Sequence, residues 1–433
     1  MSHNHANFDG RLEFIQRLLH QQFSCDVHNA KIDPIQYDPD SPFKYNNFVY
    51  RISLPSPPFT TYNGGSDRPR QPGTSPLPKG TKDFIMRLTN PDAEGMNQHT
   101  RVENEVAIIS LAAAALSGFQ PHVVPLVYGW GSAAAPSTQG WILQELMPGT
   151  PVDETFDSMP FDEKKGILAQ MAAFLKALQD FKLPHSIQQY GGVTFDTAGQ
   201  IVSTTMTSVG SGPWLSYEDY FTDRLERALQ KTDSNPYIKG WHANDVRKRL
   251  DAFVKNGIPA QFKALDSKHE KTIVHADFTP NNLLYDAATQ RITALIDYDF
   301  ACILHPSYEF LRSFSGAGGQ FQGWSDIESS EQTALRDAKL HGFPSPLPEN
   351  TKDGVKWDVA KAWEDELESM GIQRPKTMKG IEKVADVDAV LRSILPWRVT
   401  NSDVLRLQSE AVILKCRDEN EAQLIKLLDH IGF

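Results

Sequence analysis

The sequence predicts an α+β protein with two lobes: a small N-terminal lobe rich in β-strands, and a large, mainly helical C-terminal lobe. Strand-like runs surround a single long helix in residues 47–149, whereas helical periodicity dominates from residue 161 onward. The chain of 433 residues also exceeds the usual size of one hydrophobic core. We therefore expect an N-terminal lobe over residues 1–147 and a C-terminal lobe over residues 148–433.

Composition and charge favour an ordinary globular protein over a nucleic-acid-binding one. Hydrophobic residues make up 40% of the chain and charged residues 22%. The 43 basic residues are outnumbered by 54 acidic ones, for a net charge of −11. Because nucleic acids favour basic surfaces, no nucleic-acid partner is expected.

Cysteine usage and hydropathy favour a cytoplasmic protein without a membrane partner. The three cysteines are far apart in sequence, which predicts neither a disulfide framework nor a zinc site. The N-terminus lacks the apolar core of a signal peptide, and the apolar run at 108–116 is too short to span a bilayer. The oligomeric state does not follow from the sequence.

The N-terminal lobe is predicted to open with an amphipathic helix around Leu12–Leu19. Between two strands lies a segment rich in Pro and Gly, residues 55–80, which we expect to be a mobile hairpin insertion. One helix is expected over residues 99–116. The predicted strands are 47–54, 83–89, 123–130 and 140–149.

The remainder of the chain is predicted to be mostly helical. Apolar residues at helical spacing predict a helix over 161–181, and "GGVTFDTAGQIV" predicts a hairpin over 191–202. Further helices are expected over 217–230 and 242–254, and through most of the tail from 328 to 431.

A polar cluster near the middle of the chain carries the strongest functional signal. "IVHADFTPNNLLYD" places Asp277 and Asn282 in a loop between two short apolar strands, and "ALIDYDF" places Asp297 at the end of a third. If the strands pair, two carboxylates and one amide converge. Oxygen donors of this kind suit Mg²⁺, and a carboxylate beside the metal can accept a proton from a hydroxyl.

This arrangement matches the template by which the kinase fold transfers phosphoryl groups. The Asp-x-x-x-x-Asn spacing from Asp277 to Asn282 is that of the kinase catalytic loop, and Asp297 stands where that fold has a metal-binding aspartate. The sequence therefore predicts a protein-kinase-like two-lobed fold with ATP and Mg²⁺ as cofactors.

The N-terminal lobe supplies candidate nucleotide-binding residues. Arg87 stands on the strand where the template has a lysine, and arginine can also bind phosphate. Glu105 on the following helix is its candidate partner. Backbone groups around Glu145 and Met147 are expected to meet adenine. No G-x-G-x-x-G motif occurs, and the turn with Asn46 and Asn47 is the candidate equivalent of that loop.

Two further polar residues are expected to organise the loops. His275 is predicted to hydrogen-bond backbone groups rather than act as a base. Asp299 has two open readings, as a second metal contact or as a loop stabiliser.

The motifs together resemble the aminoglycoside phosphotransferase and choline kinase-like superfamily, in particular its fungal phosphotransferase-domain branch. The resemblance spans residues 40–315 and rests on "VHADFTPNNLLYD", "ALIDYDFACILHPSYEF", "RVENEVAIISL", "VVPLVYGWG" and "WILQELMPG". It implies that Asp277 is the catalytic aspartate, that Asn282 and Asp297 bind Mg²⁺, and that Glu105 pairs with the phosphate-binding residue. Arg87 departs from the family pattern.

The sequence thus predicts transfer of the γ-phosphoryl group of ATP to a hydroxyl, or less favourably an amine, of a small molecule. Two alternatives stay open: a catalytically inactive pseudokinase scaffold in which Arg87 replaced lysine, and nucleotidyl transfer on the same fold. A protein-kinase role is disfavoured because no activation segment ending in A-P-E follows Asp297. The acceptor is not identified, and an amine-bearing molecule is one option.

Overall fold

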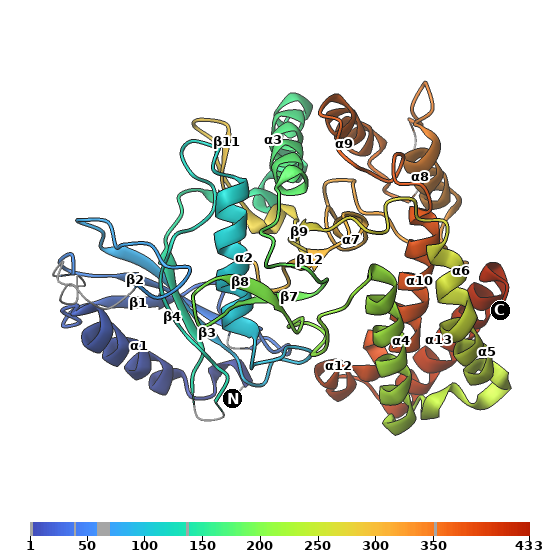
Figure 1. Ribbon diagram of the computed structural model, residues 1–433, viewed down its shortest axis with the longest axis horizontal. Helices are drawn as coiled ribbons and strands as arrows, with labels where there is room; N and C mark the ends of the chain where they lie inside the picture. The colour runs from blue at the N-terminus through green and yellow to red at the C-terminus, as the bar shows by residue number, and fades with distance from the viewer. Residues whose placement is uncertain (1–2, 39, 59–69, 136–137, 350–352) are drawn as a thin grey trace.

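The computed structural model describes residues 3–38, 40–58, 70–135, 138–349 and 353–433. Figure 1 shows the strands of one large sheet together with α1 and α2 on one side of the molecule, and a group of helices including α4, α10 and α13 on the other. Short strands such as β9 and β12 lie between them. The predicted α+β architecture is confirmed. The lobe boundary at residue 147 stays a prediction.

The N-terminal sheet has five antiparallel strands in the order β1-β2-β3-β5-β4. Four of them match the sequence-based expectation. The fifth, β1, was missed, because a four-residue edge strand ending in proline shows no useful alternation. The strands are β1 Lys31–Pro34, β2 Asn47–Ser53, β3 Asp83–Thr89, β4 Val127–Gly131 and β5 Trp141–Glu145.

Two helices pack on opposite faces of this sheet, and the alternation of side chains along a strand decides which residue meets which helix. Helix α1 (Phe8–Phe23) packs against the face that carries Phe84, Met86 and Leu88 of β3. Arg87 lies between Met86 and Leu88, so it points to the other face, toward α2 (Arg101–Ala115). The strand pattern therefore directs Arg87 toward Glu105.

The segment between β2 and β3 forms the predicted hairpin connection. Its base is closed by a hydrogen bond from the Leu54 N–H to the Lys82 carbonyl at 2.9 Å. Its C-terminal part runs along β4: the Ser75 N–H donates to Val127 O at 2.7 Å, and Trp130 Nε1 donates to Pro72 O at 2.9 Å. Residues 59–69 of the expected mobile insertion lie outside the described residues.

Short strand pairs follow the N-terminal lobe and frame the polar cluster. Strand β6 (Thr150–Pro151) pairs with β10 (Leu283–Asp286), which pairs in turn with β11 (Arg291–Leu295). Strand β9 (Thr272–Val274) pairs with β12 (Cys302–Leu304). The hairpin predicted over 191–202 is present as β7 (Gly192–Phe195) and β8 (Ile201–Thr204).

The C-terminal lobe is mainly helical, as predicted. The helix expected over 242–254 begins only at Val246, because Asn244 and Asp245 have positive φ. No helix within the described ranges is long and apolar enough to cross a membrane. The helices are α3 Phe161–Asp180, α4 Tyr217–Ser234, α5 Val246–Ala252, α6 Ile258–Phe262, α7 Ser307–Arg312, α8 Ser330–His341, α9 Trp357–Ser369, α10 Ile381–Ile394, α11 Trp397–Thr400, α12 Ser402–Arg406 and α13 Glu410–Ile431.

Candidate active site

Asp277 and Asn282 are held together by the loop that joins β9 to β10. The side-chain Nδ2 of Asn282 donates to both the carbonyl and the Oδ2 of Asp277, each at 2.9 Å. The Thr279 N–H also donates to the Asp277 carbonyl, at 2.9 Å. These bonds leave Oδ1 of Asp277 without a hydrogen bond from any described residue, so this carboxylate oxygen can accept a proton.

Asp297 is brought to the same loop by its neighbour Ile296. The Ile296 N–H donates to the Asn282 carbonyl at 2.9 Å, and the Ile296 carbonyl bonds to His275 Nε2 at 3.0 Å. Asp297 itself has φ of 64°, a left-handed conformation that aspartate tolerates better than most residues. The three oxygen-bearing side chains predicted from the motif therefore lie in one hydrogen-bonded frame.

The start of the β9–β10 loop is anchored from α7. Buried Glu309 accepts hydrogen bonds from the backbone N–H groups of His275 and Ala276, at 2.7 and 2.9 Å. Ala276 has φ of 63°, which is strained for a residue with a Cβ. Because Glu309 occupies both adjacent N–H groups, the loop is fixed in this conformation. His275 contacts the backbone through Nε2, as its predicted organising role requires.

Arg87 links the two lobes at this site. Its Nη2 lies 3.2 Å from Glu105 Oε1 and 2.8 Å from Asp297 Oδ1. Arg87 and Glu105 are both buried, so this ion pair sits in a poorly solvated environment. The arginine that stands in place of lysine thus reaches the helix glutamate and the strand-end aspartate at once.

Burial and neighbouring charges shift the pKa values of these groups in different directions. Burial and the charge of Asp297 raise the pKa of Asp277. Burial also opposes ionisation of Asp297, but the nearby Arg87 guanidinium outweighs it and lowers the pKa of that carboxyl. Burial raises the pKa of Glu105 to about 7 and lowers that of His275 to about 4. Asp297 therefore stays ionised, as a metal ligand requires, and His275 stays neutral.

Asp299 is paired with buried polar groups, and its loop-stabilising role stays a prediction. Its carboxylate receives Arg101 Nε at 3.0 Å and Nη2 at 2.7 Å, and Asn47 Nδ2 at 3.1 Å. Arg101 and Asp299 are almost fully buried. Sequence reasoning missed Arg101. It precedes Glu105 by four residues and so shares its helix face, which is a signal that could have found it.

The connection between β1 and β2 forms a cavity beside Arg87. It has a volume of about 250 Å³, and its lining includes Asn46, Asn47, Arg87 and Asp297. The predicted turn with Asn46 and Asn47 therefore lies where the first two strands of the sheet are joined, next to the candidate phosphate-binding residue.

The segment after β5 holds the remaining predicted nucleotide-binding residues. The Glu145 carboxylate is already occupied within the protein. It hydrogen-bonds with His122 Nε2 at 2.7 Å and accepts the Leu126 N–H at 3.2 Å. Met147 is buried. Within the described part of the chain, nothing accepts a hydrogen bond from the backbone N–H groups of Leu146 or Met147. These groups are free to meet a ligand.

The donor set fits Mg²⁺ held jointly with a nucleotide. No cluster of three or more His, Cys, Asp or Glu residues that could hold a metal occurs among the described residues. Mg²⁺, however, is commonly bound by one or two carboxylates together with phosphate oxygens and water. Asp297 Oδ2 has no hydrogen bond from a described residue, and the Asn282 amide oxygen receives only Asn281 Nδ2 at 3.2 Å. Both oxygens are available to a metal.

Comparison with known proteins shows which family the chain belongs to. The family model described as the phosphotransferase enzyme family matches residues 77–351, more than half of the chain, and the protein belongs to this family. The predicted superfamily and the kinase-like fold are thereby confirmed, and the fungal branch stays a prediction. No curated protein sequence matched the chain.

Several solved structures are similar over most of their length. A thermostable mutant of aminoglycoside phosphotransferase APH(4)-Ia, in complex with ADP and hygromycin B, is 14% identical, covers 94% of this chain and 98% of its own, and has a TM-score of 0.45. Ethanolamine kinase of Plasmodium vivax is 11% identical. The match covers 96% of this chain and 88% of the kinase, with a TM-score of 0.45. The gentamicin complex of APH(2")-IIa is 11% identical with coverages of 95% and 95% and a TM-score of 0.49.

Proposed function

We propose that this phosphotransferase-family protein transfers the γ-phosphoryl group of ATP to a hydroxyl, or less favourably an amine, of a small molecule, with Mg²⁺. The observation that supports this most strongly is the hydrogen-bonded frame that unites Asp277, Asn282 and Asp297 beside the Arg87–Glu105 ion pair. It is the set of parts that phosphoryl transfer requires: a base, metal ligands and a phosphate-binding cation.

In the proposed reaction, Asp277 Oδ1 accepts the proton of the acceptor hydroxyl. The hydroxyl oxygen forms a bond to the γ-phosphorus while the bond from that phosphorus to the β–γ bridging oxygen breaks, so ADP leaves. A raised pKa makes Asp277 a better proton acceptor than an ordinary aspartate. Asn282 holds its carboxylate in place through the 2.9 Å hydrogen bond to Oδ2.

The other residues position the nucleotide. Asn282 and Asp297 would hold Mg²⁺, which when bound neutralises charge on the phosphates. Arg87 would contact the phosphates from the cavity beneath the β1–β2 connection, and Glu105 orients its guanidinium. The free backbone N–H of Met147 is the proposed contact of the adenine base. Catalysis then consists mainly of positioning and charge stabilisation.

The test of this proposal is ADP release by the purified protein with Mg²⁺ and ATP, screened against pooled hydroxylated metabolites, amino alcohols and aminoglycosides. We expect acceptor-dependent ADP release that falls at least 100-fold in Asp277→Ala, because general-base catalysis contributes about 10²–10⁴-fold. Binding of ATP, measured by titration calorimetry, should change little because Asp277 does not hold the nucleotide.

Asp162→Ala is the control for this experiment, since the Asp162 side chain is 92% exposed and pairs only with Lys165. It should retain full turnover. Turnover that survives in Asp277→Ala would refute the assigned role. Nucleotide binding without turnover across the panel would favour the pseudokinase scaffold, and release of pyrophosphate instead of ADP would favour nucleotidyl transfer.

A further inference from the structure

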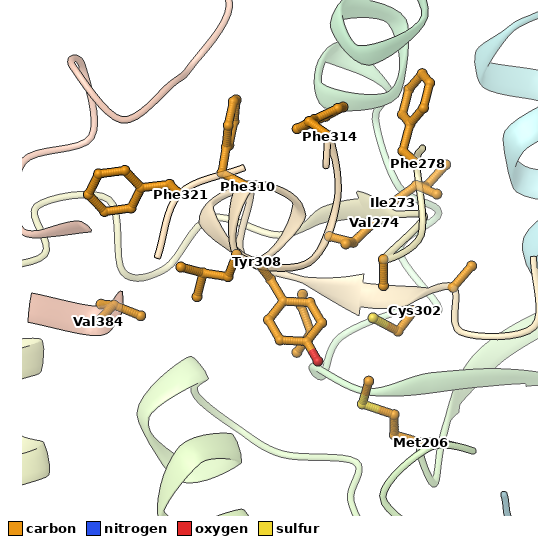
Figure 2. Close-up of a cluster of buried hydrophobic side chains, with 14 of the residues drawn as sticks. Met206, Ile273, Val274, Phe278, Cys302, Tyr308, Phe310, Phe314, Phe321 and Val384 are labelled. Atoms are coloured by element: carbon orange, nitrogen blue, oxygen red, sulfur yellow. The ribbon is translucent and has the colours of Figure 1, made fainter. Parts of the chain in front are cut away.

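Two arginines meet at Tyr308, next to the catalytic loop, without a carboxylate partner. Arg224 on α4 donates from Nη1 to the Tyr220 hydroxyl at 2.5 Å and to the Tyr308 hydroxyl at 3.4 Å. Arg312 lies one helical turn after Tyr308 on α7 and so shares its face. Figure 2 shows Tyr308 extending from α7 with its hydroxyl oxygen at the tip. The Tyr308 hydroxyl and the Arg224 guanidinium both interact electrostatically with Arg312, so the two arginines lie near each other.

The Arg312 guanidinium has no hydrogen-bonding or ionic partner among the described residues. Its side chain is only partly exposed, yet it makes no hydrogen bond or ion pair with any residue that the structure describes. Withdrawing a cation from water is costly unless it is paired, so such arginines are normally found with an anion. An unpaired and partly buried guanidinium indicates a binding site for an anionic group.

The position of Arg312 relative to Asp277 places this site at the proposed reaction centre. Ser313, the next residue, accepts the Phe278 N–H on its hydroxyl at 2.8 Å, and the Phe314 N–H donates to the Phe278 carbonyl at 2.9 Å. Phe278 directly follows Asp277. The end of α7 that carries Arg312 is therefore held against the residue that follows Asp277.

The acidic groups around this pair do not neutralise it. Asp388 on α10 is buried, and its ion pair is with Arg392, whose Nε lies 2.5 Å from Asp388 Oδ2. Arg392 also donates from Nη2 to the Leu311 carbonyl at 2.9 Å. Arg224, Arg312 and Arg392 therefore share the single carboxylate of Asp388, which leaves an excess of positive charge beside α7.

We infer that the acceptor is an anionic molecule whose carboxylate or phosphate group binds Arg312, with Arg224 beside it, while its hydroxyl faces Asp277. This inference rests on the proposed phosphotransferase function and names its substrate class. A guanidinium matches both anions because its planar fork of N–H groups can donate two parallel hydrogen bonds. The same positive charge disfavours the amine-bearing acceptor that the sequence left open.

The experiment compares matched acceptors that differ in charge: glycerate and glycerol 3-phosphate as anions, with glycerol and ethanolamine as the neutral and cationic probes. ADP release and direct binding by calorimetry are both measured at millimolar acceptor. We expect one or both anions to bind and to be phosphorylated, and their relative affinities distinguish a carboxylate from a phosphate site. Arg312→Gln should raise the KM and Kd of the anion about tenfold to a hundredfold and leave the KM of ATP unchanged.

Two further variants separate specific binding from a general change in the protein. Arg312→Lys keeps the charge and should recover part of the affinity. Arg227→Gln is the matched control, because Arg227 lies on the same helix as Arg224 but pairs with Asp223 and is 47% exposed. It should behave as the parent protein does.

The outcomes distinguish this inference from the proposed function. Anion binding that is lost in Arg312→Gln, in a protein without turnover, would support the acceptor site and refute the phosphotransferase proposal. Turnover of ethanolamine or glycerol that Arg312→Gln leaves unchanged would support the phosphotransferase and overturn the anionic acceptor. Failure of both anions to bind the parent protein, or binding that Arg312→Gln does not weaken, would also overturn it.

Discussion

Among single residues, Arg87 stands where the kinase template has a lysine, and it still reaches both Glu105 and Asp297. One nitrogen, Nη2, makes both carboxylate contacts, to Glu105 and Asp297. No described residue accepts a hydrogen bond from Nη1, and Arg87 lines the cavity under the β1–β2 connection. The guanidinium can therefore bind a phosphate without releasing either carboxylate. A lysine has a single nitrogen for all three tasks.

We therefore expect Arg87→Lys to weaken ATP binding about tenfold while the free energy of unfolding changes by less than about 1 kcal/mol. The affinity falls because one charge-assisted hydrogen bond is lost, whereas the folded state keeps a cation beside Glu105. Calorimetric titration with ATP and urea-induced unfolding measure the two quantities.

Arg51→Lys is the matched control for Arg87→Lys. Arg51 lies on the neighbouring strand β2, is 52% exposed and pairs with Asp83. Its replacement should leave ATP binding unchanged. A gain in ATP affinity or turnover in Arg87→Lys would contradict this account and would point to Arg87 as the cause of a weakened enzyme.

Single charged residues could be predicted only where a motif defined them. The loop spacing predicted Asp277, Asn282 and Asp297 as site residues, and the helix after β3 predicted Glu105; the structure brings them together, and their roles stay predictions. Arg101 shares a helix face with Glu105, so its place near that residue could have been predicted, but its partner Asp299, far away in the chain, could not. Arg312 was not found, because no local pattern indicates what its side chain faces.

Among the elements, the pairing of strand β6, which follows the N-terminal sheet, with β10 depends on Gly149. Gly149, between β5 and β6, has φ of 109°, a conformation that residues with a Cβ rarely adopt. A Cβ at this position would lie 2.9 Å from the Tyr285 carbonyl oxygen and 3.0 Å from its nitrogen. These are backbone atoms of β10, so they cannot move aside without disturbing the β6–β10 pair.

Gly149→Ala is therefore expected to lower the free energy of unfolding by at least about 2 kcal/mol, since it combines backbone strain with a backbone clash. Urea-induced unfolding measures the change. Gly166→Ala is the matched control, because Gly166 lies inside α3 with no atom near its added Cβ. That replacement should stabilise the protein by about 0.5–1 kcal/mol. Equal effects of the two substitutions would refute the argument.

Elements with a clear periodicity were predicted well, and short ones were not. Strands β2 and β3 and helix α3 follow the apolar pattern of their sequences closely. Strand β1 was missed because its pairing with β2, rather than its own four residues, makes it a strand. In the same way, the helix predicted from residue 242 begins at Val246, because the two residues before it, Asn244 and Asp245, have a left-handed backbone conformation.

Across the whole molecule, buried histidines make stability depend on pH. Burial lowers the pKa of His305 to about 4, and that of His275 likewise. In the unfolded chain a histidine has a pKa of about 6.5. Below that pH the unfolded state binds a proton that the folded state does not, so stability is complete above pH 6.5 and is lost as the pH falls toward 4.

We expect each of these histidines to contribute a loss of about 3 kcal/mol between pH 6.5 and 4. The measurement is the free energy of unfolding in urea as a function of pH, in the parent protein and in His305→Gln. The variant should show a shallower decline over this range. His269→Gln, at an exposed position, is the control and should keep the parent profile. An unchanged slope in His305→Gln would contradict the prediction.

The sequence by itself determined the fold class, the order of most elements and the candidate catalytic motif, because each of these is encoded by neighbouring residues. Periodicity reports which face of a strand or helix is buried, and the loop spacing reports a local geometry. The tertiary structure alone decided which charges meet: Arg101 pairs with Asp299, Arg87 pairs with Asp297, and Arg312 has no partner among the described residues. Such pairings depend on how segments distant in the chain pack together, and no local pattern records that.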